Sequence, residues 1–125
     1  MIPIDGAPYR LETDASDYAL GAVLAQKQNN KWHPVAFLSK SLNKAEQNYK
    51  IYYDKEMLAI MTALDEWRHH LLGAKLQFEI WTDHQNLTYF KKPQKVNQQQ
   101  ARWIMELQEY NFTLHHKLVS YIKQV

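Results

Sequence analysis

The most constraining feature of the sequence is a stripe of apolar side chains at helical spacing in mid-chain, with strand-like segments on both sides. The stripe consists of Tyr49, Tyr53, Ile60, Leu64, Trp67 and Leu71. Asn43 can cap this helix, Glu46 follows three residues later as in a capping box, and Gly73 is placed to end it. Because a helix must bury its apolar face against another layer, the segment predicts a helix packed on a sheet.

Five further segments have the pattern of strands, either alternating or continuously apolar. They are Tyr9–Asp14, Leu20–Ala25, Val35–Leu38, Leu76–Thr82 and Phe112–His115. The first three are close enough in sequence to form an antiparallel meander, with a polar turn at 28–30. A strand that returns to a sheet after a helix usually lies parallel. With a short helix over 84–90 and a long one over 98–110, the pattern predicts an α/β layer fold with a five-stranded mixed sheet.

Composition excludes several classes of protein. The 125 residues suit one domain, and 46% hydrophobic residues are enough for a core. The absence of Cys excludes disulfides, Cys–Zn sites and a thiol nucleophile. The net charge of +2 permits an anionic partner without requiring one. No apolar run reaches the roughly 18–20 residues of a membrane span, and the N-terminus does not have the pattern of a signal peptide. We therefore expect an intracellular protein, in cytoplasm or nucleus, without a membrane partner.

Two predicted strands end in the same dipeptide, Thr13-Asp14 and Thr82-Asp83. If these strands lie side by side and parallel, both carboxylates emerge at the carboxyl edge of the sheet, where open α/β sheets bind ligands. Each Asp taken singly is better explained by a turn after a strand. The pair becomes informative when a third carboxylate is added.

That third carboxylate is Glu56, which falls inside the apolar stripe of the long helix. A carboxylate on a buried face is costly unless it is paired or bound to a metal, so a buried salt bridge to Arg102 or a Lys is the competing explanation. Three clustered carboxylates repel one another, and Mg²⁺ relieves that repulsion. The sequence thus predicts Asp14, Glu56 and Asp83 as catalytic ligands of paired Mg²⁺ ions, with Mn²⁺ as a substitute, for phosphodiester hydrolysis.

The remaining aromatic and imidazole side chains have simpler explanations. His69 and His70 end a helix, where cations suit the helix dipole. His115 and His116 are adjacent on a strand and should point to opposite faces, one packed and one solvated. Three tryptophans are expected in the core rather than as base-stacking platforms: Trp32, Trp81 and Trp103.

Short motifs along the chain carry a family resemblance. In order they read LETDAS at 11–16, LGAVL at 20–24, PVAF at 34–37, YDKEMLA at 53–59, AL with WRH at 63–69, TDH with Leu87 at 82–87, RW at 102–103 and FTL at 112–114. Together they resemble the ribonuclease H domain of gypsy-class LTR retrotransposon reverse transcriptases. The likeness runs over a domain of residues 9–117, which leaves a lead-in at 1–8 and a divergent tail at 118–125.

The resemblance implies a ribonuclease H-like fold that cleaves the RNA strand of an RNA–DNA hybrid, within a Pol polyprotein fused to reverse transcriptase and integrase domains. Asp14, Glu56 and Asp83 match the family's first three metal-binding carboxylates. Gln85 and the neighbouring His84 fall where related domains contact the nucleic acid. Lys91 and Lys92 belong to a basic loop, which makes them candidates for phosphate contacts, although a loop rich in Lys more often serves only solubility. Recognition should rest on phosphates and 2′-hydroxyls rather than base edges.

The tail departs from the family pattern. After Lys117 the family continues with Pro-Gly and a final helix that bears a fourth carboxylate, whereas residues 118–125 read LVSYIKQV. No Asp or Glu follows Glu109. Two interpretations stay open: an active Mg²⁺-dependent endonuclease, or a catalytically impaired copy, truncated or frame-changed after Lys117 and without its C-terminal helix, that acts as a hybrid- or protein-binding module.

Overall fold

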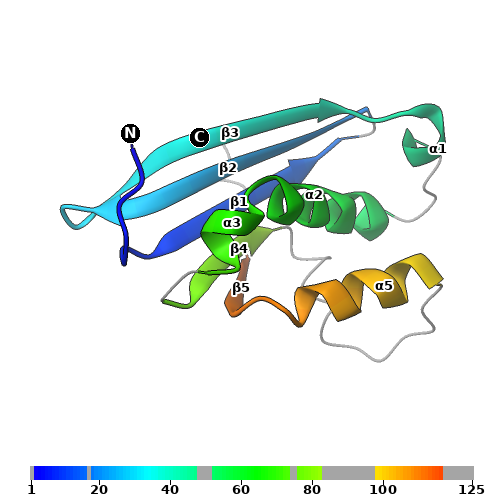
Figure 1. Cartoon of the computed structure of the whole chain (residues 1–125). Coiled ribbons are helices and arrows are strands. Elements are labelled where there is room, and N and C mark those ends of the chain that lie inside the picture. The colour runs from blue at the N-terminus through cyan, green and yellow to red at the C-terminus, as the bar shows by residue number, and fades with distance from the viewer. Residues whose placement is uncertain (1, 17, 48–51, 74–75, 83–97, 117–125) are drawn as a thin grey trace.

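A mixed sheet in the strand order β3-β2-β1-β4-β5 is the layer on which the helices pack (Figure 1). This computed structural model describes residues 2–16, 18–47, 52–73, 76–82 and 98–116. Within them the strands are β1 (Tyr9–Ala15), β2 (Ala19–Gln28), β3 (Lys31–Ser41), β4 (Phe78–Thr82) and β5 (Phe112–His116). The predicted five-stranded mixed sheet is confirmed.

The first three strands form the antiparallel meander expected from their spacing, whereas β4 pairs parallel with β1 and β5 pairs parallel with β4. Asn29 and Asn30 form the turn between β2 and β3, with φ values of 54° and 64°. Type I′ hairpin turns need positive φ at both central residues, and Asn tolerates that conformation. The predicted polar turn is therefore confirmed.

The helical segment after β3 begins as predicted but is interrupted. The Asn43 amide donates to Glu46 Oε1 at 3.0 Å, and the Glu46 amide donates to Asn43 Oδ1 at 2.8 Å, which is a reciprocal capping box. The helices that follow are α1 (Lys44–Gln47), α2 (Tyr52–Glu66) and α3 (Arg68–Leu71). Trp67 separates α2 from α3 with φ −111° and ψ 29°. The prediction of one continuous helix is wrong at this residue.

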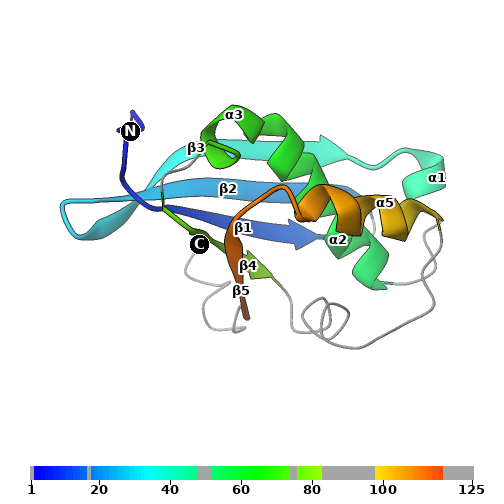
Figure 2. The same ribbon diagram turned by 60° about the horizontal axis from the view of Figure 1, so that its bottom comes forward.

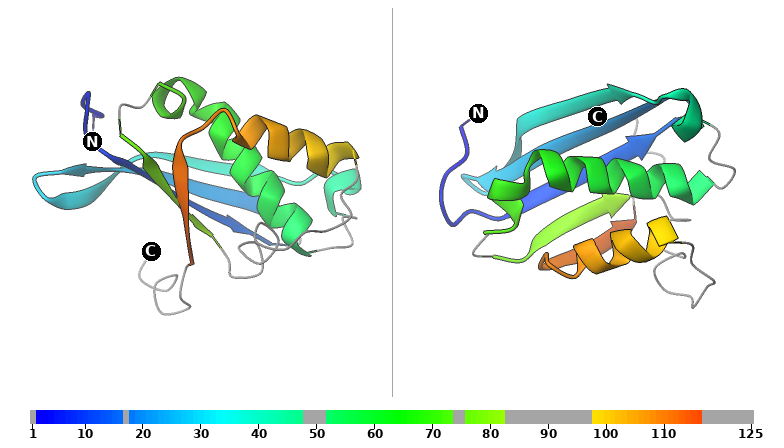
Figure 3. Two further views of the ribbon diagram at one scale, coloured as in Figure 1. Left: turned by 90° about the horizontal axis from the view of Figure 1, so that it is seen from below. Right: turned by 45° about the vertical axis from the view of Figure 1, so that its right-hand side comes forward.

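The core lies between the sheet and the helices, which occupy one face of the sheet (Figure 3). The described part of the predicted helical stripe is buried: Ile60, Leu64, Trp67 and Leu71. It packs with alternate side chains of the central strands, such as Leu11 of β1 and Ile80 of β4. The last helix, α5 (Gln98–Leu107), packs beside α2 (Figure 2) and buries Trp103 and Leu107.

Several element boundaries differ from those expected. Strand β4 begins at Phe78 rather than at Leu76, and the Leu76 side chain is 49% exposed. Strand β3 is longer than the apolar run 35–38, because strand pairing with β2 extends through polar residues. Helix α5 ends at Leu107 rather than at Tyr110. The short helix expected over 84–90 lies outside the described residues. Among the residues that are described, no helix is long and apolar enough to cross a membrane.

Truncating Leu64 tests the packing of α2 on the sheet. Leu64 is 1% exposed at the centre of the stripe, so Leu64→Ala should lower the free energy of unfolding by about 2–5 kcal/mol, through lost burial and a residual cavity. The exposed Glu66 on the same helix is the control, and Glu66→Ala should stay within about 0.5 kcal/mol of wild type. Urea denaturation measures both. Equal losses for the two variants would contradict this packing.

Candidate active site

The parallel pairing of β1 with β4 determines where the predicted aspartates can meet. Arg10 pairs with Glu79, Leu11 with Ile80, and Glu12 with Trp81. Both strands therefore run toward the same edge of the sheet. Asp14 lies near that end of β1, where its side chain is exposed and its Oδ1 accepts a hydrogen bond of 3.0 Å from the Ala15 amide.

Glu56 lies on α2 with its side chain 0% exposed, which confirms the burial expected from its place in the helical stripe. Helix α2 packs on β1 and β2, so this carboxylate is enclosed on the side of the helix that faces the sheet. Arg102, named as a competing ion-pair partner, is exposed on α5. Burial on this packed helix leaves the Glu56 carboxylate little freedom to move, as a metal ligand requires.

The other predicted site residues lie outside the described residues: Asp83, His84, Gln85, Lys91 and Lys92. Strand β4 is described as far as Thr82, which is fully buried and directly precedes Asp83 in the sequence. Over the described ranges, no three His, Asp or Glu side chains are grouped closely enough to hold a metal ion. The three-carboxylate set thus stays a prediction, with two of its members placed.

A cluster that the sequence interpretation missed lies on the sheet face opposite the helices. The Arg10 guanidinium lies over two indole rings, with its Cζ 4.2 Å from the centroid of Trp32 and 4.8 Å from that of Trp81. The Trp81 ring also stacks on His115, at 4.7 Å between centroids and 14° between planes. Trp103 is in the core as predicted, but Trp32 and Trp81 are only half-buried and belong to this outer cluster.

Glu79 joins the cluster through hydrogen bonds. Its Oε1 accepts from Arg10 Nε at 3.0 Å and from Trp81 Nε1 at 2.8 Å. Burial alone would raise the pKa of Glu79, but the hydrogen bonds from Trp81 and Arg10 and the charge of Arg10 lower it overall. A sequence signal exists in hindsight. Arg10 precedes Asp14 by four residues, and Glu79 precedes Asp83 by four residues. Two residues at the same offset from matching strand ends lie opposite each other when the strands are parallel and in register, as Arg10 and Glu79 do.

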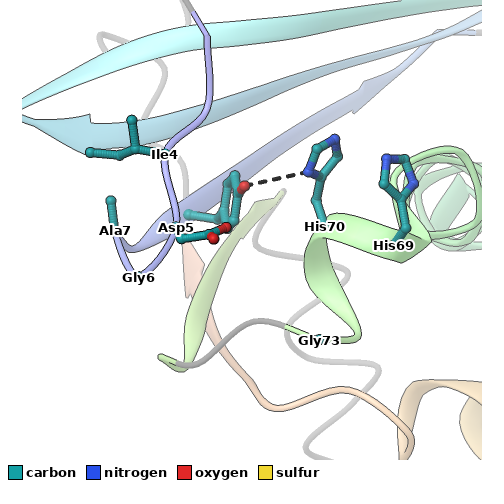
Figure 4. A pocket seen from close by; sticks show the side chains of 8 residues that line it. Ile4, Asp5, Gly6, Ala7, His69, His70 and Gly73 are labelled. Atoms are coloured by element: carbon teal, nitrogen blue, oxygen red, sulfur yellow. Dashed lines mark hydrogen bonds between the residues drawn. The ribbon is translucent and has the colours of Figure 1, made fainter.

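A small polar cavity of about 120 Å³ lies at the other end of β1, between the N-terminal segment and α3 (Figure 4). Asp5, Tyr9, His69 and His70 are among its lining residues. The Tyr9 hydroxyl is 3.4 Å from His70 Nδ1, and the ring centroids of His69 and His70 are 4.0 Å apart. Tyr9 is the first residue of β1, about 16 Å along the strand from Asp14, so the cavity is separate from the carboxylate edge.

Comparisons with known families and sequences agree with the resemblance carried by the motifs. A family model described as the RNase H-like domain found in reverse transcriptase matches residues 5–110. The chain is 46% identical over 110 residues to the Transposon Tf2-3 polyprotein of Schizosaccharomyces pombe. That alignment covers 86% of the chain but only 8% of the polyprotein.

Solved structures share the fold. The foamy viral protease-reverse transcriptase in complex with dsDNA matches with a TM-score of 0.73 and 16% identity, over 94% of this chain and 25% of that one. LC11-RNase H1 in complex with an RNA/DNA hybrid matches with a TM-score of 0.63 and 14% identity, over 90% of this chain and 86% of that one. At these identities the likeness concerns the fold alone.

His70, which lines this cavity, should make the stability of the protein depend on pH. Burial, and secondarily the charge of His69, lower the pKa of His70 from its usual 6.5. The unfolded chain therefore binds a proton at His70 more readily than the folded protein does, and protonation favours unfolding. The free energy of unfolding should be highest above about pH 6.5 and should decrease as the pH falls from there toward the lowered pKa. Urea denaturation of wild type and His70→Asn between pH 7.5 and 5.5 measures this.

In that comparison His70→Asn should lose less stability on acidification than wild type, because Asn does not titrate. Carboxylates contribute equally to both proteins, so the difference between the two curves reports on His70 and its interaction with His69. Parallel curves over the whole interval would contradict the assigned environment of this imidazole.

Proposed function

The chain belongs to the family of RNase H-like domains found in reverse transcriptase, and on this premise we propose that it is a metal-dependent endonuclease that hydrolyses the RNA strand of RNA–DNA hybrids. The family membership confirms the resemblance drawn from the motifs. The observation that carries the proposal is Glu56: a carboxylate that is 0% exposed, on a helix packed against the strand that bears Asp14. Buried carboxylates in proteins are paired or coordinate metals, so this placement of Glu56 supports a cation site.

The proposed metal ligands are Asp14, Glu56 and Asp83. RNase H-like folds generally use divalent metals, and carboxylate oxygens are the ligands that Mg²⁺ prefers, with Mn²⁺ as a substitute. Bound cations supply positive charge that lowers the pKa of an attacking water and stabilises the leaving oxygen of a phosphodiester. Asp14 near the end of β1 and Asp83 directly after β4 would present oxygens at one sheet edge, while burial keeps Glu56 oriented toward the sheet.

The nucleic acid would be bound by residues that follow β4 in the sequence. We assign Gln85 and His84 to contacts near the cleaved strand, and Lys91 and Lys92 to backbone phosphates. Contacts of this kind are nearly independent of base sequence and are weakened by salt. The sequence relatives are polyproteins of which the chain spans 8%, so the domain would act as one part of a longer Pol protein that also carries reverse transcriptase and integrase domains.

The alternative of an impaired binding module depends on the segment after Lys117. That segment lies outside the described residues, and the comparisons do not favour this alternative. Cleavage by the protein itself is therefore the property to measure.

Neutralising one predicted ligand at a time tests the carboxylate set. Each of three variants should lower the rate of RNA–DNA hybrid cleavage in Mg²⁺ by at least about 100-fold: Asp14→Asn, Glu56→Gln and Asp83→Asn. Loss of a residue that only hydrogen-bonds to a metal ligand already costs about 10–100-fold, and loss of a ligand itself should cost at least as much. A labelled hybrid and a denaturing gel measure the rate.

The matched control is Glu66→Gln, an exposed carboxylate on the same helix as Glu56, which should cleave at the wild-type rate. The assignment fails if wild type cleaves no faster than Asp83→Asn, or if Glu66→Gln is as impaired as Glu56→Gln.

The lysines predict a measurable salt dependence of binding. Each of Lys91→Ala and Lys92→Ala should weaken hybrid binding to a similar extent whatever the base sequence, and each should reduce the slope of log affinity against log salt by about 1. Fluorescence anisotropy with two hybrids of unrelated sequence, from 50 to 200 mM salt, measures both quantities. An unchanged slope in both variants would show that these lysines do not contact phosphates.

A further inference from the structure

A side-chain ion pair joins β1, which carries Asp14, to β4, which directly precedes Asp83. The pair is remote from both of these carboxylates. Arg10 Nε and Glu79 Oε1 are 3.0 Å apart, with side-chain exposures of 15% and 32%. The two residues lie directly opposite each other in the parallel register of β1 and β4. Trp81 Nε1 donates to the same Glu79 oxygen at 2.8 Å. One carboxylate oxygen thus receives donors from both strands.

The aromatic rings fix the cation of this pair. The Arg10 guanidinium lies over Trp32 of β3 and Trp81 of β4, and the Trp81 ring in turn stacks on His115 of β5. A guanidinium held between two indole rings keeps few of its rotamers, and the partial burial limits screening by salt. The Arg10–Glu79 pair is therefore far more constrained than an ordinary surface ion pair.

This arrangement penalises any shift of β4 along β1. A slip of one residue moves a strand by about 3.3 Å and turns its side chains to the other face of the sheet. Either change would break the 3.0 Å contact and separate two partly buried opposite charges, which is costly. Parallel strand pairs are also slightly less stable per residue than antiparallel ones. The Arg10–Glu79 ion pair therefore has a larger effect on strand register between β1 and β4 than it would have in an antiparallel pair.

The two members of the Arg10–Glu79 pair lie at the same distance in sequence from the two aspartates. Arg10 precedes Asp14 by four residues, and Glu79 precedes Asp83 by four residues. Four residues of strand span about 13 Å, so neither Arg10 nor Glu79 reaches a metal at the sheet edge. The pair can act on such a site only through the relative placement of the two strands.

We propose that the Arg10–Glu79 pair is a positioning device that sets the register of β1 against β4 and so holds the Asp14 and Asp83 carboxylates at the spacing that binds divalent metal. This inference rests on the proposed function. Arg10 and Glu79 are positioning residues in it, and they take no part in the chemistry themselves.

The test measures metal binding as well as cleavage. Glu79→Gln removes one charge with almost no change of size, and Arg10→Gln removes the other together with the guanidinium that lies over the two indole rings. Both should raise the dissociation constant for Mn²⁺, measured by calorimetry on the full chain without nucleic acid, by about tenfold. Both should also raise by a similar factor the Mg²⁺ concentration that gives half-maximal cleavage, while the rate at saturating metal stays within about threefold of wild type. Arg10→Lys, which keeps the charge but not the planar group that lies over the two indole rings, should recover only part of the affinity.

The chain offers a matched control in a second ion pair of the same length. Arg68 Nη2 and Glu109 Oε2 are also 3.0 Å apart, with side chains 50% and 51% exposed, and they join α3 to the segment after α5. Arg68→Gln should leave the Mn²⁺ dissociation constant at the wild-type value. All measurements are made well below the unfolding temperature of every variant, so that a general loss of stability does not change the metal affinity.

Amide hydrogen exchange gives a readout that needs no metal. In Arg10→Gln and Glu79→Gln the amides that join β1 to β4 should exchange faster than in wild type, while those between β2 and β3 stay unchanged. Wild-type Mn²⁺ affinity in both variants, or an equal loss of affinity in Arg68→Gln, would overturn this inference and leave the proposed nuclease intact. A wild-type protein that neither binds Mn²⁺ nor cleaves would overturn the proposed function and this inference together.

Discussion

The parallel pairing of β1 with β4 is the constraint on which the rest of the molecule depends. It joins the meander β1–β3 to the part of the chain that follows the helices, and it sits at the centre of the strand order. The pair is buried on one side by α2, through side chains such as Leu11 and Ile80, and tied on the other by Arg10 and Glu79. Forces of two kinds, apolar burial and a shielded ion pair, thus hold the same register.

Glu56 shows how the core and the proposed site share one helix. Most of the inward face of α2 is apolar and stabilises the fold, yet the same face encloses a carboxylate that burial makes costly. Charged groups enclosed in a core in this way are common where a protein has to bind or react. The apolar neighbours Met57 and Ile60 anchor the helix, and the anchored helix determines where the Glu56 carboxylate can be.

The two faces of the sheet have different physical characters. The face under the helices is packed with aliphatic and aromatic side chains, as expected for a sheet covered by helices. The opposite face carries half-buried aromatic rings with charges set between them, and Trp32 and Trp81 belong to it rather than to the core. Hydrophobicity alone predicted these tryptophans in the core, but an indole ring packs as well against a guanidinium as against an aliphatic side chain.

The sequence by itself determined the presence of the five strands, the capping box at Asn43, the burial of Glu56 and the family. These follow from periodicity and from motifs, which need only neighbouring residues. It could not determine that Arg10 faces Glu79, since the two are 69 residues apart and strand pairing is decided by packing across the whole domain. It also missed the break at Trp67, where the helical periodicity continues but the backbone does not. Tertiary structure decided those features because it alone brings distant segments into contact.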